Sequence, residues 1–234
     1  MRERITKVKR AAENVSLNMQ KYIFLIILIC HGIVAMAQVA VRDEPRHHNV
    51  FENEYVRVLD VHFEPGDTTL FHIHSTPSVF ISFTKTITGS QLAGQPPARS
   101  TTAVPGRLSY DSLGTPRIHR VWNEDSTWFH VMDIELTAGK PRHMEPVLQN
   151  PLLKLIFNRF MANGYSAQLK QGDNLQLPVS GAGYLIVSIG DADINVNTLQ
   201  SRLLKPGHSI WIEAGQVSSI VSNAPGSFAI LQLK

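Results

Sequence analysis

The stretch that decides the fold reads GDTTLFHIH, from Gly66 to His74, and it ends in a His-x-His pair. It follows YVRVLDVHF at residues 55–63, whose β-branched and aromatic residues predict a strand. Alternate side chains of a strand point to one face, about 6–7 Å apart along the chain. His72 and His74 are therefore predicted to aim at one point, while Ile73 turns away. Because a metal–imidazole bond is about 2.0–2.1 Å long, one ion could be reached by both rings.

A third histidine, His119, extends this pattern. It lies in IHRVWN at residues 118–123, and Asn123 opens a polar turn before another apolar run. Imidazole suits zinc, copper, iron and nickel. A His-x-His pair on its own is more often a pair of core or surface histidines, so the metal interpretation depends on the residues that frame the three.

That frame resembles the cupin superfamily of small β-barrels. The family's first motif, Gly-x5-His-x-His-x3-4-Glu-x6-Gly, is matched by Gly66, His72 and His74, and its second, Gly-x5-Pro-x-Gly-x2-His-x3-Asn, by His119 and Asn123. The resemblance implies that one divalent transition metal, which could be Fe, Zn, Mn, Ni or Cu, is held by the three histidines. Asn123 is assigned to the turn and not to the metal.

The chain departs from the family pattern at three places, one of which is the missing Gly at the end of the first motif. Ser78 or Val79 stands where the family has its Glu ligand, and Pro116 stands where a Gly precedes the second-motif histidine. The match to the ligand set is thus three of four, and no carboxylate at the motif position is available as a general base.

Other side chains are assigned by strand alternation. The candidates for pocket lining are Ser78, Phe80, His130 and His62. The two histidines among them are also explained as hydrogen-bonded core residues. His47 and His48 are expected at the surface, unless an N-terminal arm folds back to the metal.

Strand signals dominate the rest of the chain, as short runs rich in Val, Ile, Phe and Thr that are broken by Gly, Pro, Asn and Asp. The clearest runs are residues 55–63, 78–87, 127–136, 183–189 and 209–212. Helical periodicity is weak. The sequence therefore predicts an all-β fold, and the resemblance specifies the double-stranded β-helix, or jelly-roll, barrel of the cupins.

An internal repeat predicts two such barrels in tandem. Residues 65–70 (PGDTTL) match residues 171–176 (QGDNLQ) at an offset of 106 residues, and residues 78–83 then fall on residues 184–189. We predict a metal-binding barrel at 45–137, a linker at 138–155 and a degenerate barrel at 156–234.

The second barrel is predicted to lack the metal ligands. At the same offset His72 and His74 fall on Pro178 and Ser180, and Ser218 stands where the second-motif histidine would be. A second barrel can nevertheless cover the open sheet edges of the first, as can a partner in a homodimer, which is a further expectation.

The first 37 residues have the pattern of a signal peptide. Lys21 precedes the apolar run IFLIILIC at residues 23–30, which is too short to span a bilayer comfortably, and a small-x-small cleavage site follows at residues 35–37. Cleavage near Ala37 predicts a periplasmic or secreted protein with no membrane attachment, and translation could begin at Met19. The alternatives are a membrane anchor, and lipid attachment at the only cysteine, Cys30.

Removal of this leader changes the charge of the chain. Residues 1–37 hold six of the 22 Lys and Arg residues and two of the 19 acidic residues, so 16 basic and 17 acidic residues remain, for a net charge of −1. No basic patch is left to predict nucleic-acid binding. Cys30 is lost as well, so no disulfide or thiol nucleophile is expected.

Two functions are compatible with these observations. The first is a metal-dependent enzyme on a small molecule, of the dioxygenase or isomerase type that the resemblance implies. The second is a non-catalytic module that binds or senses a small molecule. Gly-x-Ser-x-Gly, phosphate-binding Gly-rich and His-Glu-x-x-His motifs are absent from the sequence.

Overall fold

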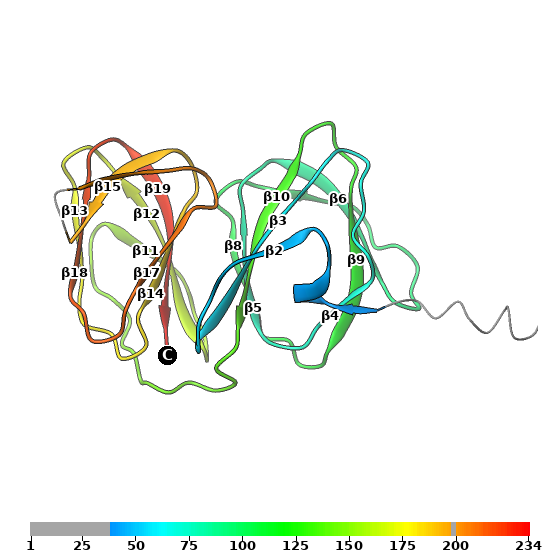
Figure 1. The fold of residues 1–234 in the computed structure, drawn as a ribbon, viewed down its shortest axis with the longest axis horizontal. Coiled ribbons are helices and arrows are strands. Elements are labelled where there is room, and N and C mark those ends of the chain that lie inside the picture. The colour runs from blue at the N-terminus through cyan, green and yellow to red at the C-terminus, as the bar shows by residue number, and fades with distance from the viewer. Residues whose placement is uncertain (1–37, 198–199) are drawn as a thin grey trace, which may run out of the picture. The chain divides into compact units, whose positions relative to one another are not determined.

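The computed structural model describes residues 38–197 and 200–234, and Gln38–Lys234 form one compact unit (Figure 1). The described residues form 19 β-strands and one short 3-10 helix. The prediction of an all-β fold is confirmed. Within these two ranges no helix is long and apolar enough to cross a membrane. The predicted signal peptide, residues 1–37, lies outside the described residues.

The first barrel is built from two five-stranded sheets. One sheet has the order β1 (Val39–Ala40), β4 (His72–His74), β9 (Arg117–Asn123), β6 (Thr86–Leu92) and β7 (Thr101–Ala103). The other has the order β2 (His47–Glu52), β3 (Val56–Phe63), β10 (Phe129–Leu136), β5 (Ser78–Ser82) and β8 (Leu108–Asp111). The 3-10 helix η1 (Val41–Asp43) connects β1 to β2. The strands of this barrel thus begin at Val39, six residues before the predicted limit at residue 45.

The second barrel is built from a five-stranded and a four-stranded sheet. The first has the order β11 (Leu153–Asn158), β12 (Ala162–Leu169), β19 (Gly226–Leu233), β14 (Tyr184–Ser188) and β17 (Ser209–Ile212). The other has the order β13 (Asn174–Leu177), β18 (Ser218–Ser222), β15 (Ala192–Val196) and β16 (Ser201–Leu204). β11 begins inside the segment that was predicted as a linker, 138–155, so the strands of this barrel start at Leu153.

The two barrels repeat one another, as the sequence predicts. Gly66 and Gly172 both have a left-handed backbone, with φ of 76° and 87°, which glycine adopts without strain. The Gly66 N–H donates to the Asn123 carbonyl, and the Gly172 N–H donates to the Ser222 carbonyl. Asn123 and Ser222 are therefore equivalent, and four residues earlier along β9 and β18 His119 is equivalent to Ser218.

Side chains alternate between the two faces of β10, and the two faces have different surroundings. On β10, Met132 and Ile134 belong to a core that contains side chains of both barrels, including Leu185 and Leu231. The intervening residues of β10 point into the first barrel, where Asp133 lines a cavity. The same register makes β10 the boundary between the inter-barrel core and the candidate site.

The interior of the second barrel is filled by its own side chains. The buried cluster there contains two tyrosines, a phenylalanine and many aliphatic residues, such as Tyr165, Leu175, Tyr184, Ile194 and Phe228. Close-packed side chains leave little room for a ligand, so this barrel supports the first one structurally.

Candidate metal centre

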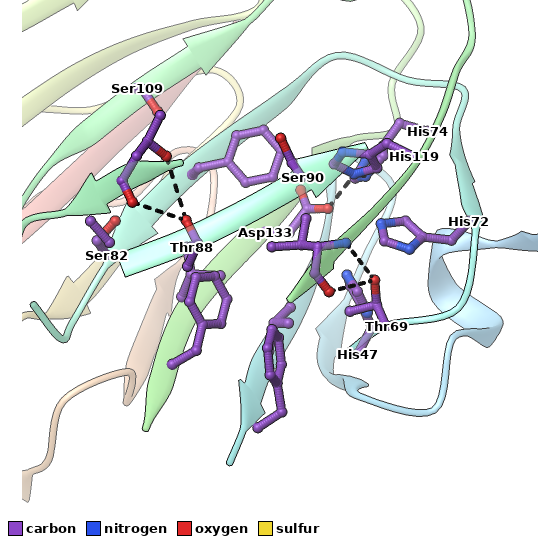
Figure 2. Close-up of a pocket in the computed structure, with 18 of the residues that line it drawn as sticks. His47, Thr69, His72, His74, Ser82, Thr88, Ser90, Ser109, His119 and Asp133 are labelled. Carbon is purple, nitrogen blue, oxygen red and sulfur yellow. Dashed lines mark hydrogen bonds and ion pairs between the residues drawn. The ribbon is translucent and has the colours of Figure 1, made fainter. Parts of the chain in front are cut away.

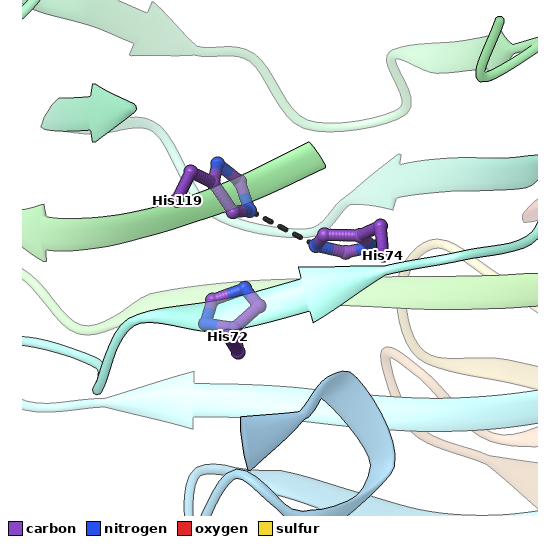
Figure 3. A group of neighbouring side chains, drawn as sticks. All are labelled: His72, His74 and His119. Carbon is purple, nitrogen blue, oxygen red and sulfur yellow. Dashed lines mark hydrogen bonds between the residues drawn. The ribbon is translucent and has the colours of Figure 1, made fainter. Parts of the chain in front are cut away.

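The three histidines of the sequence pattern come together inside the first barrel (Figure 3). β4 supplies His72 and His74, and the adjacent antiparallel strand β9 supplies His119 directly opposite His72. The ring centroids are 5.1, 4.6 and 4.8 Å apart. One nitrogen of each ring lies within 4.8 Å of the other two, so the group could hold one metal ion.

The hydrogen bonds of the rings leave the appropriate nitrogens for a metal. His72 Nδ1 lies 2.9 Å from the Leu70 carbonyl oxygen, and it must donate because a carbonyl only accepts. His72 Nε2 is therefore unprotonated, and its lone pair is available to a metal. His74 Nε2 and His119 Nε2 lie 2.9 Å apart, a spacing that one ion at about 2.0–2.1 Å from each can bridge.

All three imidazoles are held in the neutral form that binds metals. Burial lowers the pKa of His72 to about 4, of His74 to about 3 and of His119 to about 2. The positive charge of Arg117 acts in the same direction on each ring. Protons therefore do not compete with a metal for these nitrogens near neutral pH.

A buried carboxylate, Asp133, lies behind His74. Asp133 Oδ2 is 3.5 Å from His74 Nδ1, and both atoms lack a hydrogen-bond partner at normal distance among the described residues. Burial raises the pKa of Asp133 to about 7, against the effect of the Ser78 hydroxyl. If His74 Nε2 serves a metal, its proton sits on Nδ1 and faces this carboxylate, a common outer-shell partner of metal-binding histidines. The orphaned polar atoms and the three imidazoles fit a transition metal.

The segment before β2 folds over β4, the strand that carries His72 and His74. β1 pairs in parallel with β4, with Val39 opposite His72. Glu44, whose side chain is fully buried, accepts a hydrogen bond from the Leu70 N–H at 3.0 Å, while the Leu70 carbonyl accepts from His72 Nδ1. The Glu44 carboxylate thus fixes Leu70, whose carbonyl orients His72.

Glu44 also holds His47 beside the metal centre. Glu44 Oε2 lies 2.7 Å from His47 Nδ1, and the His47 ring centroid lies 4.8 Å from that of His72. The expectation that His47 is exposed is corrected, because the 3-10 turn carries the arm back onto the barrel. His48 is exposed, as expected.

We expect Glu44→Gln to weaken both the fold and the metal centre. Burial alone would raise the pKa of Glu44, but hydrogen bonds from His47, Leu70 and Arg46 outweigh it and lower the pKa from 4.5 to about 2. Because the folded-state pKa is depressed, this stabilisation is present above pH 4.5 and is lost as the pH falls toward 2. Urea unfolding at pH 7 should show a loss of about 2–3 kcal/mol, and metal affinity should fall about 10–100-fold.

Glu64→Gln is the matched control, because Glu64 is exposed. Its free energy of unfolding should stay within about 0.5 kcal/mol of the wild type. If the Glu44→Gln variant lost stability below pH 4.5 as steeply as the wild type does, the assigned role of the carboxylate would be wrong.

A cavity of about 310 Å³ lies beside the three histidines inside the first barrel (Figure 2). Its volume is in the range of small-molecule sites. Its apolar wall is formed by Val61, Phe63, Phe80, Val121, Phe129 and Val131. Its hydroxyl groups come from Thr69, Ser82, Thr88, Ser90, Thr101, Thr102 and Ser109, and its charged groups are Arg107, Arg117 and Asp133.

Of the four side chains predicted to line the pocket, Phe80 does so. Ser78 shares the inward face of β5 but is buried beside Asp133 and does not reach the cavity wall. His62 and His130 are corrected, because neither lines this cavity. The two pair across β3 and β10 on the opposite face from Asp133.

The outward histidines have a different environment. His130 Nε2 lies 2.6 Å from Asp60 Oδ1, and His62 Nδ1 lies 3.3 Å from Asp60 Oδ2. A Cβ placed on Gly207 of the second barrel would lie 3.2 Å from the His130 ring. Strand parity decides this placement, since a shift of one residue moves a side chain to the other face of the sheet.

Sequence reasoning missed Glu44, Asp133 and Arg117. Asp133 had a signal, because it is a lone acidic residue in the apolar run VMDI at residues 131–134. Glu44 had none, since its burial depends on a turn and on a two-residue strand. Arg117 shares the strand parity of His119 and could have been assigned to the same face.

The ligand set is confined to the first barrel within the described parts of the chain. Strand pairing sets Leu177 opposite Ser218, as His72 lies opposite His119, so the position of His72 is held by Leu177 and not by Pro178, the residue at the offset of 106. Ser180, the residue that the offset aligns with His74, and Ser218 are both buried. The Ser180 hydroxyl accepts from the backbone N–H groups of Ala182 and Gly183 and so serves a turn.

No protein-family model and no curated protein matches the sequence. Solved structures match the fold. The bacterial pirin YhhW of Escherichia coli, in complex with nickel(II), has a TM-score of 0.56 at 15% identity, over 80% of this chain and 87% of that chain. A cupin 2 conserved barrel domain protein from Leptotrichia buccalis has a TM-score of 0.52 at 9% identity, over 86% of this chain and 100% of that chain.

A third similar structure is the salicylate 1,2-dioxygenase from Pseudaminobacter salicylatoxidans. Its TM-score is 0.53 at 9% identity, over 79% of this chain and 73% of that chain. Likenesses at such low identity concern the fold. The chain therefore has the cupin fold, in the form of two tandem barrels, and the histidine group of its first barrel could bind a metal.

Proposed function

We propose that this protein holds one divalent transition metal through His72, His74 and His119 and uses it as an enzyme on a small molecule, in a dioxygenase-like reaction. The observation that carries the proposal is the convergence of three neutral imidazoles, two buried and one half-buried, at the wall of a cavity of about 310 Å³. Three protein ligands leave coordination positions open, as in catalytic metal sites.

When bound, the metal would supply Lewis-acid or oxygen chemistry, according to its identity. The residues around it have their own tasks. Leu70 and Glu44 orient His72, Asp133 faces the outer nitrogen of His74, and the aromatic wall excludes water from the bound molecule. Iron, zinc, manganese, nickel and copper are the candidates, and the nickel in the structure of YhhW makes nickel one of the metals to test.

A second function is favoured by one observation. Asp133 is the acidic side chain on the cavity wall, and it is buried behind His74 and so out of position to act on a substrate. This arrangement supports a non-catalytic module in which the metal holds a small-molecule ligand.

We further propose that the protein is exported, to the periplasm or outside the cell, after cleavage near Ala37. The support is the leader-like sequence of residues 1–37. Because β1 begins at Val39, cleavage there would leave every described strand in place.

Elemental analysis of the protein, purified without a histidine tag, tests the metal centre. We expect about one transition metal per chain, and its identity will decide between oxygen and Lewis-acid chemistry. If the chain retained no metal after incubation with iron, zinc, copper, nickel and manganese in turn, the enzyme proposal would be abandoned and the binding module would remain.

A further inference from the structure

We propose that the cavity binds an organic carboxylate with a neighbouring hydroxyl or oxo group and an apolar body, and that Arg117 contacts its carboxylate beside the metal. This inference rests on the proposed function, since it takes the three histidines as the ligands of a divalent ion. It goes beyond that function by naming the chemical class of the ligand and the side chain that selects it.

The position of Arg117 is the first argument. Arg117 lies on β9 two residues before His119 and directly opposite His74 on β4. Residues two apart on a strand, and directly opposed residues on neighbouring strands, share one face of the sheet. Arg117 therefore lies on the same face as these two histidines, and it lines the same cavity.

The charge of the cavity is the second argument. Its wall carries two cations, Arg107 and Arg117, and one acidic group, Asp133. Asp111 pairs with Arg117 Nη1 at 2.5 Å, but Asp111 does not line the cavity. With neutral imidazoles, a divalent ion adds its full charge beside a guanidinium, which is unfavourable in a poorly solvated site. An anion that lies between the ion and Arg117 removes this repulsion.

The apolar wall is the third argument. Phe63, Phe80 and Phe129 face the cavity, and the Phe63 and Phe129 rings stack with centroids 4.7 Å apart. Such a wall favours a ligand with an apolar, preferably aromatic, body. A carboxylate with an adjacent hydroxyl or oxo group can in addition offer two oxygens to a metal that has open positions.

A pair of matched probes tests this inference. Mandelate has a phenyl body, a hydroxyl and a carboxylate, while 1-phenyl-1,2-ethanediol has the same body and two chelating oxygens without the carboxylate. Each is titrated by calorimetry into cobalt(II)-loaded protein, and the cobalt content of every sample is measured. We expect mandelate to bind at least about tenfold more tightly than the diol, and Arg117→Gln to weaken mandelate about 10–100-fold while binding of the diol hardly changes.

Two further variants separate a specific contact from a general loss of charge. Arg117→Lys should keep part of the preference for mandelate, because it keeps the charge but not the planar fork. Arg107→Gln removes a positive charge from the same cavity but not from β4 or β9, so it should weaken mandelate clearly less than Arg117→Gln does.

The outcomes decide the inference and the proposed function separately. Equal affinities for mandelate and the diol, or wild-type mandelate affinity in a fully cobalt-loaded Arg117→Gln variant, overturn the anion site and leave the metal centre intact. If the wild type takes up neither cobalt nor any of the five candidate metals, the proposed metal centre fails. Mandelate binding to the metal-free protein then decides: binding that is lost in Arg117→Gln supports the anion site, and no binding overturns it.

Discussion

His74→Ala is expected to remove the bound metal while the fold remains. Two of the three ligands would be left, and the carboxylate of Asp133 behind His74 would lose the group that it faces. Outer-shell partners alone contribute about 10–100-fold to metal affinity, so loss of a ligand should cost more than this. Elemental analysis of the variant after dialysis should find well below one metal per chain.

Ser218→Ala is the matched control for this substitution. Ser218 is buried at the position of the second barrel that corresponds to His119, so the change also removes a polar side chain from a barrel interior. Its metal content should equal that of the wild type. If both variants kept full metal content, the site would be wrongly assigned. If Ser218→Ala alone lost metal, the second barrel would hold the site.

The sequence predicts the metal centre better than its surroundings for a physical reason. A His-x-His pair on a strand shares a face whatever the details of the fold, and the spacing from Gly66 to His72 resembles a known motif. The supporting groups depend on tertiary structure. Glu44 becomes buried because a two-residue strand docks on β4, and so short a pairing has no periodic signature in the sequence.

The two corrected histidines show how the surroundings of a strand change along its length. On β10, Met132 and Ile134 pack in the core that both barrels share, whereas the His62 side chain, on the same outer face of the sheet, is 42% exposed. Residues 59–63 (LDVHF) alternate between apolar and polar, and this alternation assigns Val61 to the inner face and His62 to the outer face. The pairing of β3 with β10 settles the parity.

The repeat was predictable because the same turn occurs in both barrels. The Gly-Asp pairs at residues 66–67 and 172–173 each end the same turn and make the same backbone hydrogen bonds. The limits of the barrels were harder to predict from the sequence. β11 begins at Leu153, directly after a turn at Asn150 and Pro151 in which the Leu153 N–H donates to the Asn150 carbonyl, so the strands of this barrel start three residues before the predicted limit at residue 156.

Ile134→Ala is expected to destabilise the whole two-barrel unit. Ile134 is fully buried on β10, between Val58 on β3 and Val79 on β5, in the core that both barrels share. Removal of such a side chain leaves a cavity and costs about 2–5 kcal/mol. For a chain of this size each kcal/mol lowers Tm by about 2–4 °C. Calorimetry should show one transition at a lower temperature, because a shared core couples the two barrels.

Leu203→Ala is the control, since Leu203 is 76% exposed on β16 and should change the free energy of unfolding by no more than about 0.5 kcal/mol. Two separate transitions would show that the barrels fold independently. A cost below about 1 kcal/mol for Ile134→Ala would show that this side chain does not hold the shared core. Asp133, the next residue on β10, lines the cavity, so a strand that loses its support on one face also loosens the site on the other. We therefore expect the Ile134→Ala variant to release its metal at a lower temperature than the wild type. In this view the second barrel stabilises the metal centre through packing alone.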